Sequence, residues 1–304
     1  MSKFKTENLN RWYSKGQFEI LDCRLGEFEL FYIDEKPKQA SDQTILFLHG
    51  FPTSSYDFDG IWPALNKNYR LVTLDMLGFG FSEKPNNRDY SIHQQADLFE
   101  SLISKLGLDS FHVVAHDYGV SVAQELLARQ LDNNGSGRWL SCVLLNGGLF
   151  PETHRALAIQ KLMLSPLGKW INRLAGIKQF SKSFSSVFGA ATQPSTLQLQ
   201  EFWESICHRN GRHLFHNLIT YILDRREHRA RWVDALQSST VQMALINGSV
   251  DPVSGSHLVD RYKELDCRLD YLKELPTIGH YPHVEAADQV AEAIIEFLET
   301  DSRN

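Results

Sequence analysis

The sequence has few of the features that mark secreted, membrane-spanning or zinc-binding proteins. Only four of its 304 residues are cysteine, and no two of them stand in a C-x-x-C spacing, which argues against a disulfide scaffold or a zinc ribbon. No apolar run approaches the roughly 18 residues that cross a bilayer. The N-terminus is polar and lacks the apolar centre of a signal peptide. We therefore predict a cytoplasmic protein with reduced thiols and no membrane span.

The charge balance narrows the choice of partners. The formal net charge is −6, with 22% charged and 42% hydrophobic residues, which is typical of a globular protein and gives no basic excess for nucleic acid or anionic membrane. The length suits one large domain or a domain with an insertion. We expect no cofactor and no nucleic-acid partner, and the sequence does not indicate the oligomeric state.

Strand-like and helix-like segments alternate along most of the chain. Two alternating runs around Gly26 predict an antiparallel hairpin over 18–36. Later apolar runs are continuous, as in strands that are buried on both faces, and helical spacing separates them. The pattern predicts an α/β fold with a mostly parallel sheet and helices on both sides. The predicted strands are 44–50, 69–76, 111–117, 139–148, 241–248 and 269–276, and the predicted helices are 55–65, 91–107, 120–131 and 284–299.

The alternation of strand-like and helix-like segments is interrupted between about residues 148 and 232. This stretch is helical or irregular, rich in aromatic and basic residues, and has no convincing buried strand. We predict a core formed by 1–147 and 236–304, interrupted by a helical cap over 148–235. Ligands of such sheets bind beyond the carboxyl ends of the strands. A cap that leaves from the end of the 139–148 strand would cover that site.

Short polar motifs follow the predicted strands. Asp117 stands at a strand-to-helix turn, where esterases place the serine of a G-x-S-x-G elbow. Taken singly, Asp117 would be a helix N-cap, Asp251 a turn residue and His280 an ordinary buried histidine. Their order along the chain is nucleophile, acid, histidine, which together predicts a catalytic triad. The motifs are HGFP (49–52), DMLGFGFS (75–82), AHDYG (115–119), GSVDP (248–252) and GHYP (279–282).

On these motifs the chain resembles the α/β-hydrolase superfamily, and within it the branch with an aspartate nucleophile, the epoxide hydrolases and haloalkane dehalogenases. The resemblance extends from about residue 27 to the end of the chain. The stretches HGFPTSSYDF, LGFGFSEKP, HDYG, NGGLFPETHR and DPV are also similar to the mesoderm-specific transcript group of hydrolase-like proteins. The resemblance implies an α/β-hydrolase fold with an inserted cap.

The resemblance also implies a two-step reaction. Asp117 would attack an electrophilic carbon and become an ester, and His280, oriented by Asp251, would activate the water that hydrolyses it. By motif position, the oxyanion hole would be formed by the backbone N–H groups of Phe51 and Tyr118. The implied partners are a small apolar electrophile and water.

The electrophile is less clearly indicated. Dehalogenases hold the halide with a tryptophan after the nucleophile and an asparagine in H-G-N-P, whereas this chain has Tyr118 and Phe51 there. Tyr118 also stands where fluoroacetate dehalogenases carry an arginine. Epoxide hydrolases carry H-G-F-P, H-D-W-G and lid tyrosines that protonate the opening ring, and Tyr221 is the one tyrosine between 148 and 232. An epoxide is therefore favoured, but tryptophans in the predicted cap leave a halide site open: Trp170, Trp203 and Trp232.

Other polar residues receive lesser predictions. His49 and His116 are predicted, with Tyr221, to bind substrate or assist proton transfer. Glu285 is expected to be structural, at the start of the last helix. No metal site is predicted, because the histidines of the cap have no carboxylate-rich partner set; these are His208, His213 and His216. A ligand-binding protein on the same fold, with slow or no turnover, is the third alternative.

Overall fold

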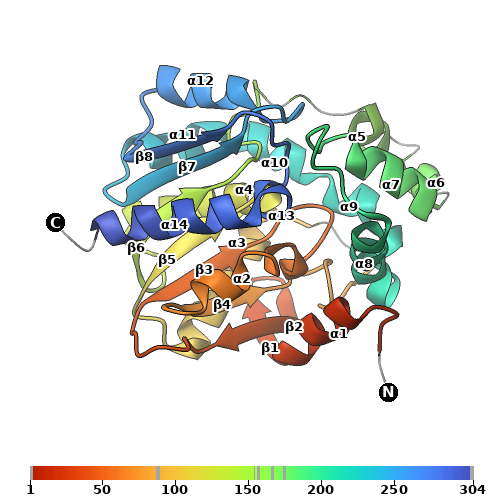
Figure 1. The fold of residues 1–304 in the computed structure, drawn as a ribbon, viewed down its shortest axis with the longest axis horizontal. Helices are drawn as coiled ribbons and strands as arrows, with labels where there is room; N and C mark the ends of the chain where they lie inside the picture. The colour runs from red at the N-terminus through yellow and green to blue at the C-terminus, as the bar shows by residue number, and fades with distance from the viewer. Residues whose placement is uncertain are drawn as a thin grey trace.

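Eight strands form one sheet in the order β1-β2-β4-β3-β5-β6-β7-β8 in the computed structural model (Figure 1), which describes residues 3–86, 90–153, 155, 158–165, 168–173 and 176–301. β1 and β2 form the predicted antiparallel hairpin, β2 runs antiparallel to β4, and the strands from β4 to β8 are parallel. The mostly parallel sheet is thereby confirmed. The strands are β1 (Gln17–Cys23), β2 (Gly26–Glu35), β3 (Thr44–Leu48), β4 (Arg70–Leu74), β5 (Ser110–Ala115), β6 (Arg138–Leu144), β7 (Gln242–Gly248) and β8 (Tyr271–Leu275).

The central strands are buried on both faces, which explains their continuous apolar sequences. In β3, Leu46 and Leu48 belong to one core cluster, whereas Ile45 and Phe47 belong to the other. Successive side chains of a strand point to opposite faces, so each strand contributes to two separate cores. A strand of this kind requires helices on both sides of the sheet.

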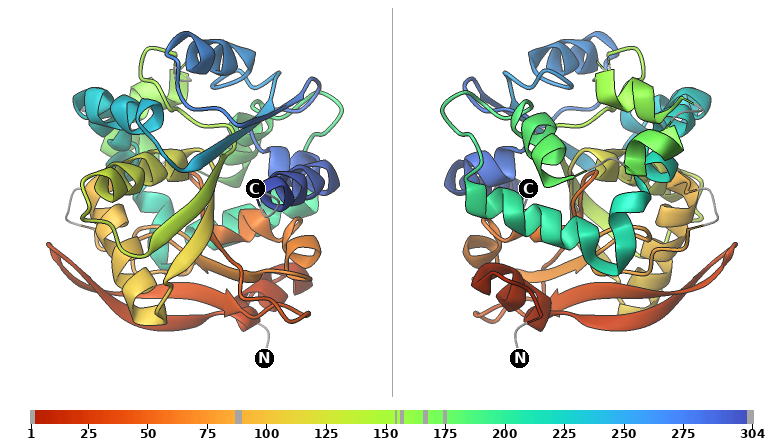
Figure 2. Two further views of the ribbon diagram at one scale, coloured as in Figure 1. Left: turned by 90° about the vertical axis from the view of Figure 1, so that its left-hand side faces the viewer. Right: turned by 90° about the vertical axis from the view of Figure 1, so that its right-hand side faces the viewer.

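Helices cover both faces, as the two side views show (Figure 2). One core cluster joins the sheet to α3 (Ile92–Leu106), α4 (Tyr118–Leu131), α11 (Arg229–Gln237) and α12 (Ser256–Glu264). The other joins it to α1 (Glu7–Lys15), α2 (Trp62–Leu65) and α14 (Ala287–Asp301). Two short elements lie near the site, namely the 3-10 helix η1 (Ser55–Phe58) and the helix α13 (Pro282–Glu285).

The described part of the segment between β6 and β7 consists of helices joined by loops and contains no strand. Most of its helices gather at one end of the molecule (Figure 1). α11, however, packs against α4 of the core, so the predicted boundary at residue 235 falls inside a core-facing helix. The remaining elements are α5 (Ala158–Met163), α6 (Gly168–Arg173), α7 (Ile177–Ser185), α8 (Thr196–Cys207), η2 (His208–His213), α9 (Phe215–Leu218) and α10 (Tyr221–Glu227). We call α5–α10 the cap; the exact division of the chain stays a prediction.

Two structural findings bear on the expectations about compartment. All four cysteines are free thiols. Within the described ranges, no helix is both long enough and apolar enough to cross a bilayer. The cytoplasmic location stays a prediction.

Candidate active site

Asp117 occupies a sharp turn between β5 and α4. Its backbone has φ 44° and ψ −103°, a positive-φ conformation that is strained for a non-glycine residue. The turn needs a small neighbour, because a Cβ at Gly119 would lie 2.2 Å from the carbonyl oxygen of Leu48. This strained geometry is the one that presents a nucleophile at the end of a strand.

Both carboxylate oxygens of Asp117 have a polar partner. The backbone N–H of Phe51 donates to Oδ2 over 3.1 Å, and Nε2 of His280 lies 3.6 Å from Oδ1. Tyr118 is the first residue of α4, so its N–H has no acceptor within the helix. Phe51 and Tyr118 are thus available as the two backbone donors near the nucleophile, at a helix N-terminus that favours negative charge.

His280 is held from its other side by Asp251. Nδ1 of His280 lies 2.7 Å from Oδ2 of Asp251. That carboxylate also accepts hydrogen bonds from the backbone N–H groups of Val253 (2.7 Å) and Ser254 (3.0 Å), and from the Ser254 hydroxyl (2.6 Å). So many donors fix the carboxylate in its ionised form and fix the ring that it orients.

The three triad side chains are buried, and their pKa values are set by competing effects. Burial alone would raise the pKa of Asp117 and of Asp251, but the hydrogen bonds and charge of His280 outweigh it and hold both pKa values below their usual range. Burial would lower the pKa of His280, but Asp251 and Asp117 together raise it to about 10. In the resting site, a protonated His280 therefore lies between two carboxylates.

Glu285 has a structural role, as expected from the sequence, because it holds the loop that carries His280. One carboxylate oxygen accepts from the N–H groups of Gly279 (2.9 Å) and Gly189 (2.8 Å), and the other accepts from the N–H of Tyr281 (3.1 Å). Gly189 follows the cap helix α7 in the sequence. One side chain thus ties the catalytic loop to the cap.

A cavity of about 110 Å³ opens onto the nucleophile. Its volume is below that of typical small-molecule sites, so the arrangement suits a small ligand. Asp117 and His280 form part of its wall, and most of the rest is apolar, which suits an uncharged electrophile. The lining residues are Phe51, Pro52, Asp117, Gln160, Phe180, Ser183, Phe184, Val187, Val253, His280 and Tyr281.

The predicted lid tyrosine, Tyr221, is not part of the cavity wall. Tyr221 is fully buried, its ring packs 4.8 Å from that of Tyr118 and 6.0 Å from that of Phe51, and it does not line this cavity. Sequence position alone placed it in the cap, but the direction of its ring depends on how α10 packs.

His49 and His116 do not line the cavity either. The ring of His49 accepts from the N–H of Met76 over 3.0 Å and donates to the carbonyl of Gly50 over 2.9 Å. Nε2 of His116 donates to the carbonyl of His280 over 2.8 Å. Both rings are fully buried, so they support the loops around the site and do not face a ligand there.

The tryptophans that could form a halide site also lie away from the cavity wall. Trp232 is buried and donates to Glu125 over 2.9 Å. The ring of Trp203 packs 5.3 Å from that of Phe180, and Trp170 is 63% exposed. Among the described residues that line the cavity, none is a tryptophan.

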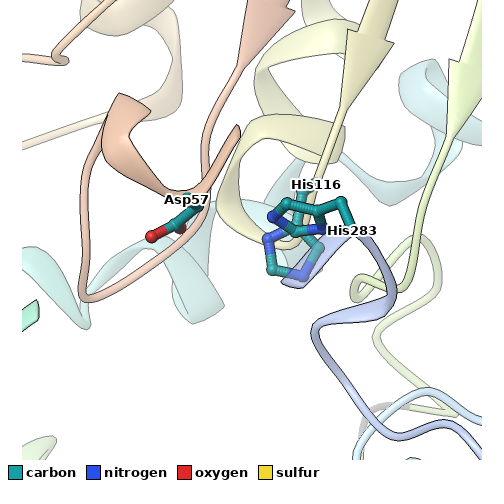
Figure 3. A group of neighbouring side chains, drawn as sticks. All are labelled: Asp57, His116 and His283. Carbon is teal, nitrogen blue, oxygen red and sulfur yellow. The ribbon is translucent and has the colours of Figure 1, made fainter. Parts of the chain in front are cut away.

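Beneath the site, Asp57, His116 and His283 form a buried cluster (Figure 3) whose possible ligand atoms lie within 4.8 Å of one another. Two imidazoles and a carboxylate could serve zinc or iron. Burial lowers the pKa of both histidines and raises that of Asp57, so each of the three side chains is shifted towards its neutral form. The cap histidines belong to no such group within the described residues: His208, His213 and His216.

Two further residues complete the site: Asn146, which occupies the alternative position for the acid but carries no charge, and Arg225, which the sequence did not single out. The amide of Asn146, at the end of β6, donates to Asp251 over 3.0 Å. Arg225 of α10 reaches the backbone carbonyl of Asp117 over 2.9 Å. Both contacts join residues that lie more than a hundred positions apart, and no local spacing signals such a pair.

Comparisons with known proteins agree with the fold. A family model described as alpha/beta hydrolase fold matches residues 43–287. The mesoderm-specific transcript homolog protein of Bos taurus is 40% identical over 296 residues, which cover 91% of this chain and 84% of that protein.

Solved structures show the same fold at lower identity. A loop variant of the haloalkane dehalogenase DbeA from Bradyrhizobium elkanii is 18% identical, with a TM-score of 0.77, and the match covers 95% of this chain and 97% of that one. The epoxide hydrolase CorEH is 17% identical, with a TM-score of 0.75, and the match covers 94% and 98% of the two chains.

Proposed function

The chain belongs to the α/β-hydrolase family, and from this we propose that it hydrolyses a small apolar electrophile, an epoxide above all, through an ester on Asp117. The observation that carries the proposal is the setting of that carboxylate. Oδ2 accepts from the N–H of Phe51, Oδ1 lies 3.6 Å from His280, and the side chain faces a largely apolar cavity. A helix cap would need none of these.

In the first step, a carboxylate oxygen of Asp117 attacks a ring carbon of the epoxide. The new C–O bond forms as the ring C–O bond breaks, and the bonding pair goes to the ring oxygen, which takes a proton from a water molecule. The hydroxide that remains is neutralised by the proton that His280 releases once Asp117 is an ester. In-line attack directs that oxygen away from Asp117, towards the cap. There the polar lining residues are Gln160 of α5 and Ser183 of α7.

In the second step, water attacks the carbonyl carbon of the Asp117 ester. His280 takes the proton, and the oxyanion receives hydrogen bonds from the N–H groups of Phe51 and Tyr118, each of which is worth on the order of 3 kcal/mol in such sites. Collapse of this intermediate breaks the bond to the alcohol oxygen, which leaves with the proton from His280. The products are a diol and the carboxyl of Asp117, whose proton passes to His280, so that the resting carboxylate and protonated ring are restored.

The two steps need His280 in different states, and the geometry accounts for the change. Asp117 and Asp251 both favour the protonated ring in the resting enzyme. Once Asp117 is an ester, one of these charges has gone, so the pKa of His280 falls and the ring is able to act as a base. Formation of the intermediate thus prepares the base that removes it.

The cavity wall favours an epoxide over a haloalkane. A halide needs N–H donors on the cap side, and the described wall has no tryptophan there. A haloalkane remains the second candidate, with the amide of Gln160 as the donor. A binding protein is the third candidate, and the completeness of the triad argues against it.

The test uses the His280→Gln variant with a panel of epoxides, haloalkanes and activated esters. Alkylation needs only the carboxylate, so intact-mass spectrometry should show a retained adduct. An epoxide adds its whole mass, whereas a haloalkane adds an alkyl group without its halogen. Peptide mapping should place the group on Asp117, and Asp117→Asn should take up nothing. An adduct elsewhere, or turnover in Asp117→Asn, would refute the mechanism.

A further inference from the structure

One arginine of the cap, Arg225, contacts Asp117, the proposed nucleophile. Arg225 lies on α10 and is only 1% exposed, whereas Arg226, its neighbour on the same helix, faces solvent. A buried arginine is costly unless its donors and its charge are matched. The partners of Arg225 therefore indicate why the chain keeps it there.

Those partners belong to the nucleophile turn and the helix behind it. Nε of Arg225 donates to the hydroxyl of Ser121 over 2.6 Å, and Nη2 donates to the backbone carbonyl of Asp117 over 2.9 Å. The same Nη2 lies 3.9 Å from Oδ1 of Asp117. The guanidinium also lies over the ring of Tyr221, 4.4 Å from its centroid.

We propose that Arg225 is a positioning residue for the nucleophile, through which the cap holds the strained turn in place and keeps Asp117 as a carboxylate. This rests on the proposed function, since it assigns a role in the alkylation step. Arg225 is not part of the described cavity wall, so it acts through Asp117 and does not touch substrate.

The first part of the role is geometric. The carbonyl of Asp117 accepts from the N–H of Val120 over 3.2 Å, and Arg225 supplies a second and shorter hydrogen bond to it. The turn has a positive φ, which the surrounding structure must hold. A charged donor on this carbonyl stabilises the turn more than a neutral one would.

The second part is electrostatic. The ionisable groups around Asp117 come from every neighbouring loop: His280 and Tyr281 after β8, His116 beside it, His49 after β3, Asp57 of η1, and Tyr221 and Arg225 of α10. His280 gives up its charge during the cycle, whereas a guanidinium stays charged at any working pH. The charge of Arg225 is therefore a constant contribution that lowers the pKa of Asp117.

A consequence concerns the cap. Because Arg225 belongs to α10, the full stabilisation of the carboxylate requires that the cap be seated on the core. The cap is then more than a cover that excludes water: it completes the electrostatic environment of the nucleophile.

The experiment isolates alkylation in the His280→Gln background, with an epoxide that forms the adduct there. Arg225→Gln should slow adduct formation at least tenfold at neutral pH and should shift the acid midpoint of that rate upward by about one pH unit or more. Arg225→Lys should recover part of the midpoint shift, because it keeps the charge. Ser121→Ala, which removes only the anchor of Nε, should shift the midpoint less, in the same direction. Arg226→Gln is the control and should change neither rate nor midpoint.

The outcomes separate the two proposals. If His280→Gln forms no adduct with any substrate, the proposed function fails before Arg225 is tested. If the adduct forms and Arg225→Gln leaves its rate and midpoint unchanged, the positioning role is refuted. The positioning role is also refuted if Arg225→Gln, Arg225→Lys and Ser121→Ala all slow adduct formation and leave the acid midpoint unchanged. Loss of packing alone would slow the reaction in this way without changing the pKa of Asp117.

Discussion

Nδ1 of His280 lies 2.7 Å from Asp251, and the amide of Asn146 donates to the same carboxylate oxygen from the end of the neighbouring strand. In the proposed triad the acid therefore follows β7, and Asn146, two residues beyond the end of β6, supports it as a neutral donor. An asparagine cannot carry the negative charge that stabilises an imidazolium, so Asn146 can orient Asp251 but cannot replace it as the acid.

Asp251→Asn should slow hydrolysis of the ester by about 10⁴-fold, by analogy with the same change in a serine triad. The amide would favour the wrong tautomer of His280 and would remove the charge that stabilises its protonated form. Single-turnover measurements should show the adduct forming and persisting. Asp260→Asn, an exposed change on α12, is the control, and near-normal turnover in Asp251→Asn would mean that another group is the acid.

The titration of His280 should depend on Asp117. The ring should stay protonated from neutral pH to about 10 in the resting protein, because two carboxylates favour the charged form. Asp117→Asn removes one of them, so the midpoint should move to lower pH. NMR of the labelled imidazole measures both midpoints. Equal midpoints in the two proteins would show that Asp117 does not stabilise the charged ring.

Buried Lys84 should give the stability a pH dependence of its own. Its Nζ donates to the carbonyls of Gly80 and Ser82, and burial lowers its pKa to about 7, against about 10.4 in an unfolded chain. Between these values the unfolded state binds the extra proton, so this contribution to the free energy of unfolding rises with pH, by up to about 1.4 kcal/mol per unit.

Lys84→Met removes that contribution. Its stability relative to wild type should therefore fall as the pH rises from about 7 to about 10, whatever the offset from the lost hydrogen bonds. Urea denaturation of both proteins at several pH values gives the difference between their free energies of unfolding. The opposite contribution of His280 is present in both proteins, so it cancels in this difference. Lys263→Met, at an exposed position, serves as the comparison. A difference that does not change with pH would show that Lys84 stays charged in the fold.

Glu285→Gln should destabilise the protein by about 1–3 kcal/mol, since an amide cannot replace the charged acceptor of several backbone N–H groups. The hydrogen bonds to Gly189 and Gly279 join the cap to the catalytic loop, so turnover should fall as well. Thermal and urea denaturation provide the measurement, with the exposed Glu292→Gln as control. Unchanged stability would mean that the loop is held by other contacts.

Much of this protein could be read from local sequence. Apolar runs such as 44–50 belong to strands buried on both sides, and hydrophobic burial is a local requirement that each residue type reveals. Ser91 caps α3 and Gly107 ends it in a left-handed conformation, as their chemistry dictates. The triad could be proposed from sequence because motifs at the carboxyl ends of parallel strands meet at one edge of the sheet.

What the sequence determined by itself was therefore the sheet, the order of the motifs and the candidates Asp117, Asp251 and His280. The tertiary structure alone decided which cap side chains reach the site. Tyr221 does not line the cavity, whereas Arg225, four residues later, reaches the backbone of Asp117. The physical reason is that residues four apart lie on the same face of a helix, so helical spacing cannot say which of the two meets the site. That is decided by how α10 packs on the core, and packing depends on surfaces that are distant in the chain.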